Sequence, residues 1–355
     1  YYFEIVRDQA LLRRMIQTCT KAIADAYDET GEVDRLVGEV EQAVLAINRD
    51  HNVVDMPKIS EHVRDAVAKI ELLFKNKGST TGVETGFTDL DKMTTGLHPG
   101  EMIVVAARPS MGKTSLAMNI VEHVALDAKL PVGVFSLEMS SESLVMRMIS
   151  SLARINSHDM QDGMLTPQDF PRITDAAGRL ANSSLHIDDS AGLSILQLTA
   201  RARRMWQQHG IKLFVIDYLQ LLHSTSRRAG ENRQQEIAEI SSGIKALAKT
   251  LGVPVIVLSQ LNRELEKDKN RKPRLSDLRE SGSIEQDADL VGLLYKPGGV
   301  DEDTDDPESE ARPVNLLIAK QRNGPTGDVP LTFLKGYTRF ENAAKFNRED
   351  MPQDD

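Results

Sequence analysis

One segment of the chain has the residue types and spacing of a phosphate-binding loop. Residues 107–114 read Ala-Arg-Pro-Ser-Met-Gly-Lys-Thr and follow the apolar run Met102–Ala106. They match the P-loop pattern G-x-x-x-x-G-K-[ST], with Ala107 in place of the first glycine. Gly112 would let the backbone approach phosphates, whose charge the loop N–H groups and the amino end of the next helix can bind. The alternative is a chance Gly-Lys-Thr at the start of a helix, and the strand–loop–helix context argues against it.

The P-loop pattern gives each polar residue a contact. We expect Lys113 to contact the β- and γ-phosphates and the Thr114 hydroxyl to coordinate Mg²⁺. The cofactors that the pattern implies are therefore ATP and Mg²⁺. The segment predicted to bind the nucleotide consists of Ser110, Met111, Gly112, Lys113, Thr114 and Ser115.

Two carboxylates end other apolar runs. Asp217 ends the run at residues 213–216, and a carboxylate at the carboxyl end of a central strand faces the ligand crevice of an α/β sheet. We predict that Asp217 holds the water shell of Mg²⁺. Glu138 ends the strand predicted after the P-loop helix, where it can polarise an attacking water as a general base. For Glu138, a carboxylate that caps a helix is a competing interpretation.

A neutral amide ends a further predicted strand. Gln260 closes the sequence Val-Leu-Ser-Gln at residues 257–260. An amide there can detect the γ-phosphate and transmit its presence to Leu261 and Asn262. An ordinary polar residue at the end of a strand explains the pattern equally well.

Short apolar runs alternate with helical patterns from Thr85 onward. Nearly continuous apolar runs suit parallel strands that are buried on both faces of a sheet. The predicted strands are Met102–Ala106, Val132–Phe135, Leu213–Ile216, Val253–Leu258 and Leu290–Tyr295. The predicted helices between them include Ser115–Ala125, Leu196–His209 and Ile237–Thr250. The alternation predicts an α/β fold with a mostly parallel central sheet. Residues 314–319 and 329–334, on either side of Asn-Gly-Pro at 323–325, predict a β-hairpin.

Helical patterns also precede the predicted sheet. Apolar residues at helical spacing over residues 5–23 and 33–47, with Gly31 between them, predict two antiparallel helices. A third helix is predicted to begin near Ser60 as its N-cap and to carry a narrow apolar stripe that ends at Phe74. This helix could dock on a neighbouring subunit or on its own domain, and its periodicity does not decide between the two.

The composition limits the class of protein. Hydrophobic residues make up 40% and charged residues 27% of the 355, which is typical of a globular chain. The single cysteine, Cys19, excludes a disulfide framework and a cysteine-based zinc site and fits a reducing compartment. No apolar run reaches the ~20 residues that span a bilayer, so we expect no membrane association. The net charge of −10 argues weakly against a general nucleic-acid coat but allows a small basic channel. Part of the acidity is local to residues 301–310.

Six segments occur together in the order of one known family. They read Ala-Ala-Arg-Pro-Ser-Met-Gly-Lys-Thr at 106–114, Phe-Ser-Leu-Glu-Met at 135–139, Ile-Asp-Tyr-Leu-Gln-Leu at 216–221, Leu-Ser-Gln-Leu-Asn-Arg at 258–263, Asp-Leu-Arg-Glu-Ser-Gly-Ser-Ile-Glu-Gln-Asp-Ala-Asp at 277–289 and Ala-Lys-Gln-Arg-Asn-Gly at 319–324. Over roughly residues 57–342, the chain closely resembles the bacterial replicative helicases of the DnaB family.

This resemblance implies a RecA-like P-loop NTPase fold preceded by an α-helical hairpin and a linker helix. Residues 1–50 would form the hairpin, which is part of the family's amino-terminal collar domain. Residues 51–83 would form the linker with an amphipathic helix at 60–75, and residues 84–342 the RecA-like ATPase and helicase domain. We expect residues 343–355 to be a disordered tail. The opening Tyr-Tyr-Phe, without Met, indicates a piece of a longer chain.

The resemblance also implies roles for residues. Glu138 matches the catalytic glutamate, Asp217 the Walker-B aspartate and Gln260 the γ-phosphate sensor. Lys320 and Arg322 match hairpin cations that reach the neighbouring subunit's nucleotide, and their alternation along a strand would point both side chains the same way. Without the resemblance, a solvated strand face would explain those two cations.

DNA binding is assigned by the same resemblance. Arg279, Glu280 and Gly282 match the loop that holds the DNA backbone, and a cation with a glycine-containing turn suits phosphate. Glu280 would repel phosphate, so we expect it to orient a neighbouring cation instead. The family implies a homohexamer around single-stranded DNA, with 5′-to-3′ movement driven by ATP bound between subunits. It also implies a helicase loader and a primase as partners, in the bacterial cytoplasm at the replication fork.

Two other classes of protein share part of this pattern. A RecA-like strand-exchange ATPase would have the P-loop and the parallel sheet, but not the linker helix or the Lys-x-Arg hairpin. A hexameric scaffold that binds ATP only for assembly would not need the full set of Lys113, Glu138, Asp217 and Arg322. The first would form a filament, and the second would not hydrolyse ATP.

Overall fold

The protein is described here by a computed structural model of the 355-residue chain. The structure describes residues 2–28, 36, 38, 40, 43–44, 58–75, 80–224, 233–262, 271–278, 282–297 and 311–343. The chain divides into two compact units, Tyr1–Gly78 and Ser79–Asp355. Among the described residues, no helix is long and apolar enough to cross a bilayer.

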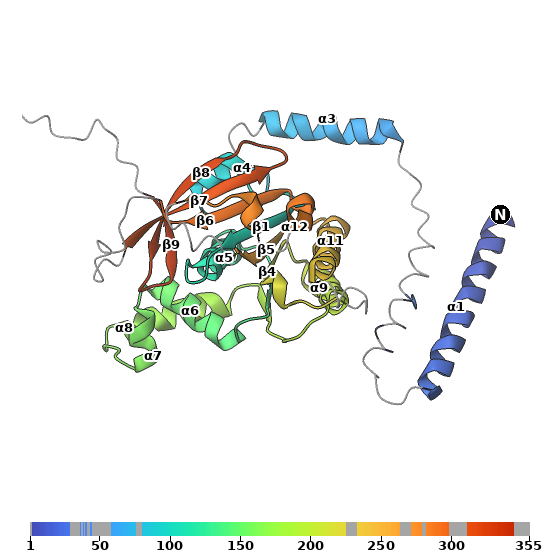
Figure 1. Cartoon of the computed structure of the whole chain (residues 1–355), viewed down its shortest axis with the longest axis horizontal. Coiled ribbons are helices and arrows are strands. Elements are labelled where there is room, and N and C mark those ends of the chain that lie inside the picture. The colour runs from blue at the N-terminus through green and yellow to red at the C-terminus, as the bar shows by residue number, and fades with distance from the viewer. Residues whose placement is uncertain are drawn as a thin grey trace, which may run out of the picture. The chain divides into compact units, whose positions relative to one another are not determined.

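The second unit is built on one nine-stranded sheet (Figure 1). The strands lie in the order β3-β2-β4-β5-β1-β6-β7-β8-β9. Pairing is parallel from β3 to β6 and antiparallel from β6 to β9. The strands are β1 Met102–Ala107, β2 Val132–Ser136, β3 Leu185–Asp188, β4 Leu213–Asp217, β5 Val255–Gln260, β6 Leu290–Tyr295, β7 Ala311–Gln321, β8 Gly327–Leu334 and β9 Arg339–Asn342. The predicted α/β fold with a mostly parallel sheet is confirmed, and so is the hairpin, formed by β7 and β8.

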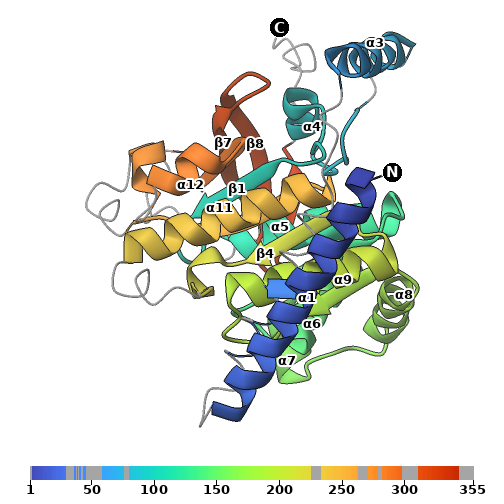
Figure 2. The same ribbon diagram turned by 90° about the vertical axis from the view of Figure 1, so that its right-hand side faces the viewer.

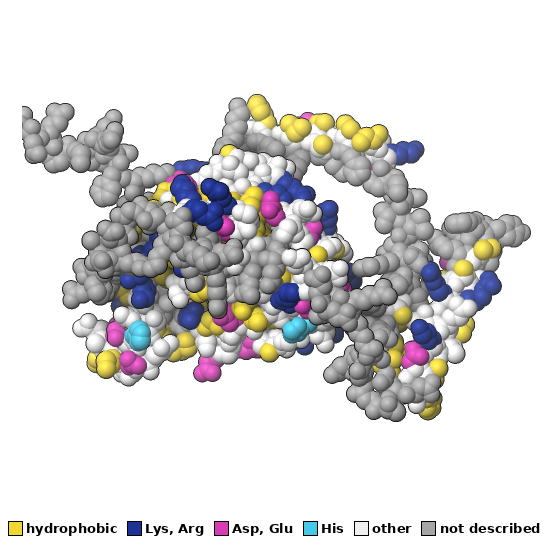
Figure 3. Space-filling view, viewed as in Figure 1, with side chains coloured by type: hydrophobic (Ala, Val, Ile, Leu, Met, Phe, Trp, Pro, Cys, Tyr) yellow, Lys and Arg dark blue, Asp and Glu magenta, His cyan; other side chains and the backbone are white. Residues whose placement is uncertain are grey.

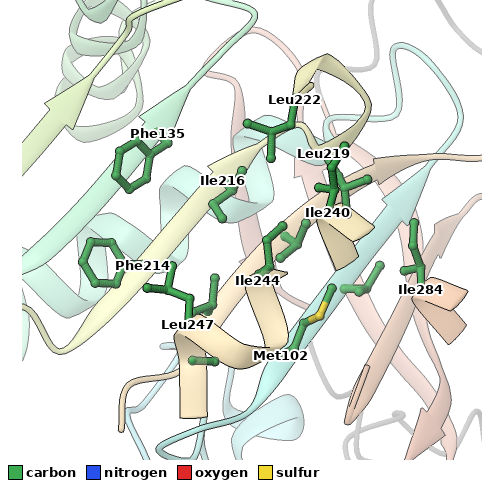
Figure 4. Close-up of a cluster of buried hydrophobic side chains, with 14 of the residues drawn as sticks. Met102, Phe135, Phe214, Ile216, Leu219, Leu222, Ile240, Ile244, Leu247 and Ile284 are labelled. Carbon is green, nitrogen blue, oxygen red and sulfur yellow. The ribbon is translucent and has the colours of Figure 1, made fainter. Parts of the chain in front are cut away.

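Helices cover both faces of this sheet. They are α4 Thr88–Thr94, α5 Lys113–Glu122, α6 Ser141–Ala153, α7 Ser157–Asp162, α8 Asp169–Ala181, α9 Ile195–His209, α11 Arg233–Leu251 and α12 Gly282–Asp287, and a π-helical turn, His123–Asp127, continues α5. Side chains of β1 alternate between the faces, because successive residues of a strand point in opposite directions. Met102 and Val104 pack with α9 and α11, whereas Ile103 and Val105 pack with α4 and α5. Figure 2 shows α9 and α11 together on one side of the sheet, and Figure 4 shows Met102 in the cluster beneath α11.

The central strands give the sheet two distinct ends. At the carboxyl end of the sheet, β1 finishes at Ala107 beside Gln260 of β5. At the amino end, β1 starts at Met102, and the neighbouring β6 starts at Leu290. The six residues of β1 separate these ends by roughly 17 Å, at about 3.3 Å per residue.

The first unit contains two long helices, α1 Tyr2–Asp28 and α3 Ile59–Lys75. The second predicted helix of the hairpin, at 33–47, lies largely outside the described residues. An apolar row runs along one face of α3 (Figure 3). It consists of five side chains that are 48% to 77% exposed, Ile59, Val63, Val67, Ile70 and Phe74. The predicted apolar stripe is therefore present and unburied in this chain.

The predicted starts of α3 and β5 are wrong. Ser60 is not an N-cap, because α3 already includes Ile59 and the backbone N–H of Glu61 donates to Lys58 O at 2.8 Å. The strand predicted at 253–258 instead begins at Val255 and runs to Gln260. Proline at position 254 has no N–H to donate, which explains why regular pairing starts after it.

Candidate functional site

The predicted P-loop lies at the carboxyl end of the sheet, between β1 and α5. Gly112 is the N-cap of α5 and has a φ of 82°, in the left-handed region that favours glycine. A Cβ on Gly112 would lie only 2.9 Å from the Phe340 ring, so a side chain has no room there. The glycine is thus required by both the backbone conformation and the packing. The first N–H groups of α5 have no partner within the helix and can bind an anion.

Three polar side chains converge behind this loop. Thr114 Oγ1 donates a hydrogen bond to Asp217 Oδ2 at 2.7 Å, and Lys113 Nζ lies 3.5 Å from Asp217 Oδ1. Lys113 Nζ also lies 4.4 Å from the centroid of the Tyr218 ring. Asp217 is 4% exposed, and its Oδ1 accepts no hydrogen bond from the described residues.

The donor set fits a magnesium ion. Mg²⁺ prefers oxygen ligands and usually takes one or two from the protein, with waters and phosphate oxygens as the rest. The Thr114 hydroxyl and the Asp217 carboxylate are such oxygens, side by side, and the buried Asp217 Oδ1 accepts no hydrogen bond from the described residues. Among the described residues, no three His, Cys, Asp or Glu side chains gather as a metal site.

Glu138 and Gln260 border the same cavity as the P-loop. The prediction that Glu138 ends β2 is wrong. The strand ends at Ser136, and Glu138 lies two residues beyond it with its side chain exposed. Glu138 is not a helix cap either, because the N-cap of α6 is Ser140, whose side chain accepts a hydrogen bond from the Ser143 N–H. The capping interpretation of Glu138 is therefore excluded. Gln260 is the last residue of β5, in register with Ala107.

The cavity has a volume of about 890 Å³, within the range of sites for small ligands. It is lined by Ser110, Gly112, Lys113, Thr114, Ser115, Glu138, Tyr218 and Gln260, and it extends to the turn between β8 and β9 and to the start of α7. Met111 packs against the core instead of lining it. Four further cationic side chains line it, Arg108, Arg147, Arg312 and Lys335. Several cations around one cavity favour an anionic ligand.

Three of these cations carry no signal in the sequence. Arg147 belongs to α6, Arg312 to β7 and Lys335 to the segment after β8, so they are more than thirty residues from the P-loop. The fold alone brings them together. Only Arg108, inside the P-loop itself, could have been found from the motif.

The two hairpin cations lie at the other end of the sheet. Arg322 directly follows β7, and its N–H donates to Asp289 O at 2.9 Å; the N–H of Asp289 donates in turn to Met102 O at 2.9 Å. Lys320 Nζ donates to Glu285 O, and Arg322 Nη2 donates to Gln286 O at 2.6 Å. Both side chains therefore point the same way, toward the end of α12, and neither borders the cavity.

The residues predicted to bind DNA are only partly described. Arg279 and Glu280 lie outside the described residues, and Gly282 is the exposed first residue of α12. No atom of the residues that the structure describes lies within 4 Å of a Cβ built on Gly282, so their packing does not require a glycine there. The role of these three residues stays a prediction.

Comparisons with known proteins agree with this geometry. Residues 82–342 match the family described as the DnaB-like helicase C terminal domain. The replicative DNA helicase DnaB of Geobacillus stearothermophilus is 42% identical over 353 residues, which cover 99% of this chain and 77% of that protein. The replicative DNA helicase DnaB of Pasteurella multocida is 44% identical over 97% of this chain and 74% of its own.

Two solved structures are similar to this chain. One is an ATPase domain with a TM-score of 0.74 and 37% identity, and the match covers 82% of this chain and 100% of that domain. The other is a DnaB-like replicative helicase, described together with its interactions with primase. It has a TM-score of 0.77 and 32% identity over 96% of this chain and 78% of its own.

Proposed function

The chain belongs to the family of DnaB-like replicative DNA helicases, which hydrolyse ATP, and we propose that it acts as one subunit of a hexameric ring. The ring encircles single-stranded DNA, moves along it from 5′ to 3′ and separates the duplex at the replication fork. Each ATP, with Mg²⁺, is bound by the carboxyl end of one subunit's sheet and completed by the amino end of the next.

One observation carries this proposal. The phosphate-binding loop and the hairpin cations lie at opposite ends of β1, which are roughly 17 Å apart. Lys320 and Arg322 are therefore too far from the P-loop of their own chain to touch a phosphate there. If the amino end of one subunit faces the carboxyl end of the next, these cations reach the neighbour's nucleotide. Such a head-to-tail contact produces a closed ring when its rotation closes.

At the carboxyl end, each residue has a distinct task. The N–H groups of residues 110–115 and the Lys113 ammonium bind oxygens of the β- and γ-phosphates. Thr114 and Asp217 would hold Mg²⁺, which neutralises charge on those oxygens when it is bound. Glu138, exposed at the cavity, orients the attacking water and accepts its proton. Lys320 and Arg322 of the adjoining subunit stabilise the charge on the transferred phosphoryl group.

A backbone route leads from Gln260 toward the predicted DNA loop. The N–H of Leu261 donates to Ala107 O at 3.1 Å, and Leu261 forms a β-bridge with Leu278. The next residue, Asn262, donates its N–H to Asp277 O at 2.9 Å. A displacement of Gln260 by the γ-phosphate would thus be transmitted to Leu278, which directly precedes Arg279. This route supports a sensor role for Gln260, with Arg279 and Gly282 gripping the DNA backbone and Glu280 orienting a cation.

The exposed apolar row of α3 supports assembly. Five large apolar side chains on one face of a helix cost free energy in water, and an interface with another chain would remove that cost. We propose that α3 docks on the neighbouring subunit. Primase and a helicase loader are the further partners in this proposal, and the place of action is the replication fork in the bacterial cytoplasm.

Strand separation tests the proposed function. The chain is mixed with ATP, Mg²⁺ and a forked duplex that carries a 5′ tail, a 3′ tail or both. We expect unwinding only when the 5′ tail is present. Glu138→Gln should bind ATP normally and lose unwinding, whereas Glu142→Gln, an exposed carboxylate in the first turn of α6, should unwind like the unchanged chain.

Three results would contradict the proposal. The first is unwinding that needs only the 3′ tail, which would reverse the polarity. The second is normal unwinding by Glu138→Gln. The third is a closed ring that hydrolyses ATP on the fork without separating it, which would identify a different DNA-linked ATPase.

A further inference from the structure

Arg322 is held by its own subunit through three contacts. Its backbone N–H donates to Asp289 O at 2.9 Å, and its Nη2 donates to Gln286 O at 2.6 Å. Its Nη1 lies 3.5 Å from Asp289 Oδ1. The side chain nevertheless remains 47% exposed. The guanidinium is thus fixed along one edge and open to solvent along the rest.

The carbonyl groups of Glu285 and Gln286 accept hydrogen bonds from Lys320 and Arg322. Both carbonyls belong to α12, a helix that is anchored to α11. Ile284 of α12 is fully buried in the same apolar cluster as Ile240 and Ile244 of α11 (Figure 4). Ser241 Oγ of α11 donates to Asp287 Oδ2 at 2.6 Å. The last carbonyls of α12 therefore form a fixed surface, and cations are favoured there because a helix ends in unpaired C=O groups.

Asp289 connects this surface to the start of the central strand. Its side chain is 9% exposed, and its Oδ2 accepts the Met102 N–H at 2.8 Å and pairs with Lys245 Nζ. Lys245 also donates to Gly100 O at 2.9 Å. Oδ2 is thereby occupied, and Oδ1 is the oxygen that faces Arg322. One carboxylate thus joins β1, α11 and the hairpin cation.

Guanidinium chemistry suits this arrangement. A guanidinium has five N–H donors in a rigid plane, so one edge can be held while another binds a phosphate oxygen in a defined direction. Lys320 beside it is less suited to bind a phosphate, because burial and the neighbouring Arg322 charge lower the pKa of the Lys320 ammonium. The two cations repel each other, and the carbonyls of Glu285 and Gln286 hold them together.

We infer that Asp289 is a positioning residue, which with the Gln286 carbonyl orients the Arg322 guanidinium for the phosphate of the adjoining subunit. The inference rests on the proposed function, in which Arg322 acts on a neighbour's nucleotide. A cation that is already oriented need not lose rotational freedom when the transition state forms. Loss of Asp289 should therefore lower kcat and leave ATP binding unchanged.

Asp289→Asn is the test, with Lys245→Met as its matched control. The amide oxygen of Asn can still accept the hydrogen bond from the Met102 N–H. The NH₂ group then points toward Arg322, so that two hydrogen-bond donors face each other. Lys245→Met breaks the same buried ion pair but leaves Asp289 Oδ1 for Arg322. We expect Asp289→Asn to lower the kcat of ATP hydrolysis roughly tenfold at unchanged KM, since loss of the ion pair and the new donor–donor contact turn the guanidinium away from its productive direction. Lys245→Met should stay within about twofold of the unchanged ring.

Combination with Arg322→Ala separates positioning from a general structural role. If Asp289 acts through Arg322, the double variant Asp289→Asn/Arg322→Ala should hydrolyse ATP no more slowly than Arg322→Ala alone. Equal losses in Asp289→Asn and Lys245→Met, or a further loss in the double variant, would overturn the inference. Should Asp289→Asn fail to form rings, the double variant Asp289→Asn/Lys245→Met takes its place, because it leaves no buried Lys245 charge without a partner. The double variant must show the same tenfold loss of kcat.

The same series distinguishes the inference from the function on which it rests. Normal turnover by Arg322→Ala would remove the proposed shared site itself. Loss of turnover in Arg322→Ala with full turnover in assembled Asp289→Asn rings would overturn only the positioning role of Asp289.

Discussion

The two ends of β1 are built in contrasting ways. At the carboxyl end, the P-loop and the tips of β2, β4 and β5 surround a cavity of about 890 Å³ lined with cations. At the amino end, Lys320 and Arg322 rest on backbone carbonyls and Asp289, and they border no such cavity. The carboxyl end has a cavity suited to phosphate, whereas Lys320 and Arg322 lie at the amino end and outside that cavity. The contrast supports our proposal that two copies of the chain complete one site together.

The largest expected effect comes from Arg322→Ala. The loss of one cation that stabilises a transferred phosphoryl group lowers turnover by roughly 10³-fold or more. ATP should still bind, because the cavity of the same chain is unchanged. Steady-state hydrolysis and binding of a fluorescent ATP analogue measure the two quantities. Arg204→Ala, an exposed cation on α9, is the control and should leave both unchanged. If Arg322→Ala weakens nucleotide binding as much as it lowers turnover, the division between a nucleotide-binding carboxyl end and a catalytic cation at the amino end is contradicted.

A smaller effect is expected from Gln260→Ala. Gln260 borders the cavity, but the main phosphate contacts come from the P-loop, so ATP binding should persist. We expect the stimulation of hydrolysis by single-stranded DNA to fall about tenfold, in line with the loss of one hydrogen bond to a charged group. Hydrolysis rates with and without an oligonucleotide measure this effect. Undiminished stimulation would rule out Gln260 as the link between the cavity and the DNA loop.

The smallest effect on ATP turnover is expected from a change at Glu122, the last residue of α5, the helix that starts at the P-loop. Glu122 is 4% exposed, and burial raises its pKa to about 7, although Arg339 Nη1 lies 3.1 Å from its Oε2. The unfolded chain has a glutamate pKa of 4.5, so between pH 4.5 and 7 the folded chain binds the extra proton. This contribution to stability is complete below pH 4.5 and is lost as the pH rises through 7, by about 3 kcal/mol at most.

Glu122→Gln should remove that pH dependence and barely change ATP turnover. Urea unfolding at pH 5 and pH 8 gives the free energy of unfolding of both proteins. The unchanged chain should lose more stability over this interval than Glu122→Gln does. Parallel losses in the two proteins would show that Glu122 is ionised throughout, and that the far end of α5 carries no titrating group.

The carboxyl end is predictable from the sequence because its signals are local. The P-loop is one continuous string, and Asp217 ends an apolar run that is a strand in the structure. The apolar pattern places Glu138 at the end of β2, but it lies in a bend two residues beyond the strand; Leu137 is still held to the sheet, because its N–H donates to Asp217 O at 2.7 Å. Arg147 and Arg312 escape sequence reasoning, since α6 and β7 are distant from the P-loop in the sequence and only the fold brings them to the cavity.

The amino end is predictable only through family resemblance. Alternation along β7 gives the common direction of Lys320 and Arg322, but nothing local relates Arg322 to Asp289 or to Lys245. Two strands also escape prediction for a physical reason. β3 and β9 are four residues each, and polar or charged side chains alternate with few apolar ones, so neither forms an apolar run. Short edge strands of this kind take their structure from the neighbouring strand.

Mixed rings test the shared site most directly. Arg322→Ala subunits and Lys113→Ala subunits, with different affinity tags, are produced together, and rings that carry both tags are isolated. Each variant alone should be nearly inactive. In mixed rings, about a quarter of the interfaces join an intact P-loop to an intact Arg322, if subunits assemble at random in head-to-tail order. We predict that ATP hydrolysis returns to about that fraction of the unchanged ring. Mixed rings no more active than the separate variants would show that Lys113 and Arg322 do not act in one site across an interface.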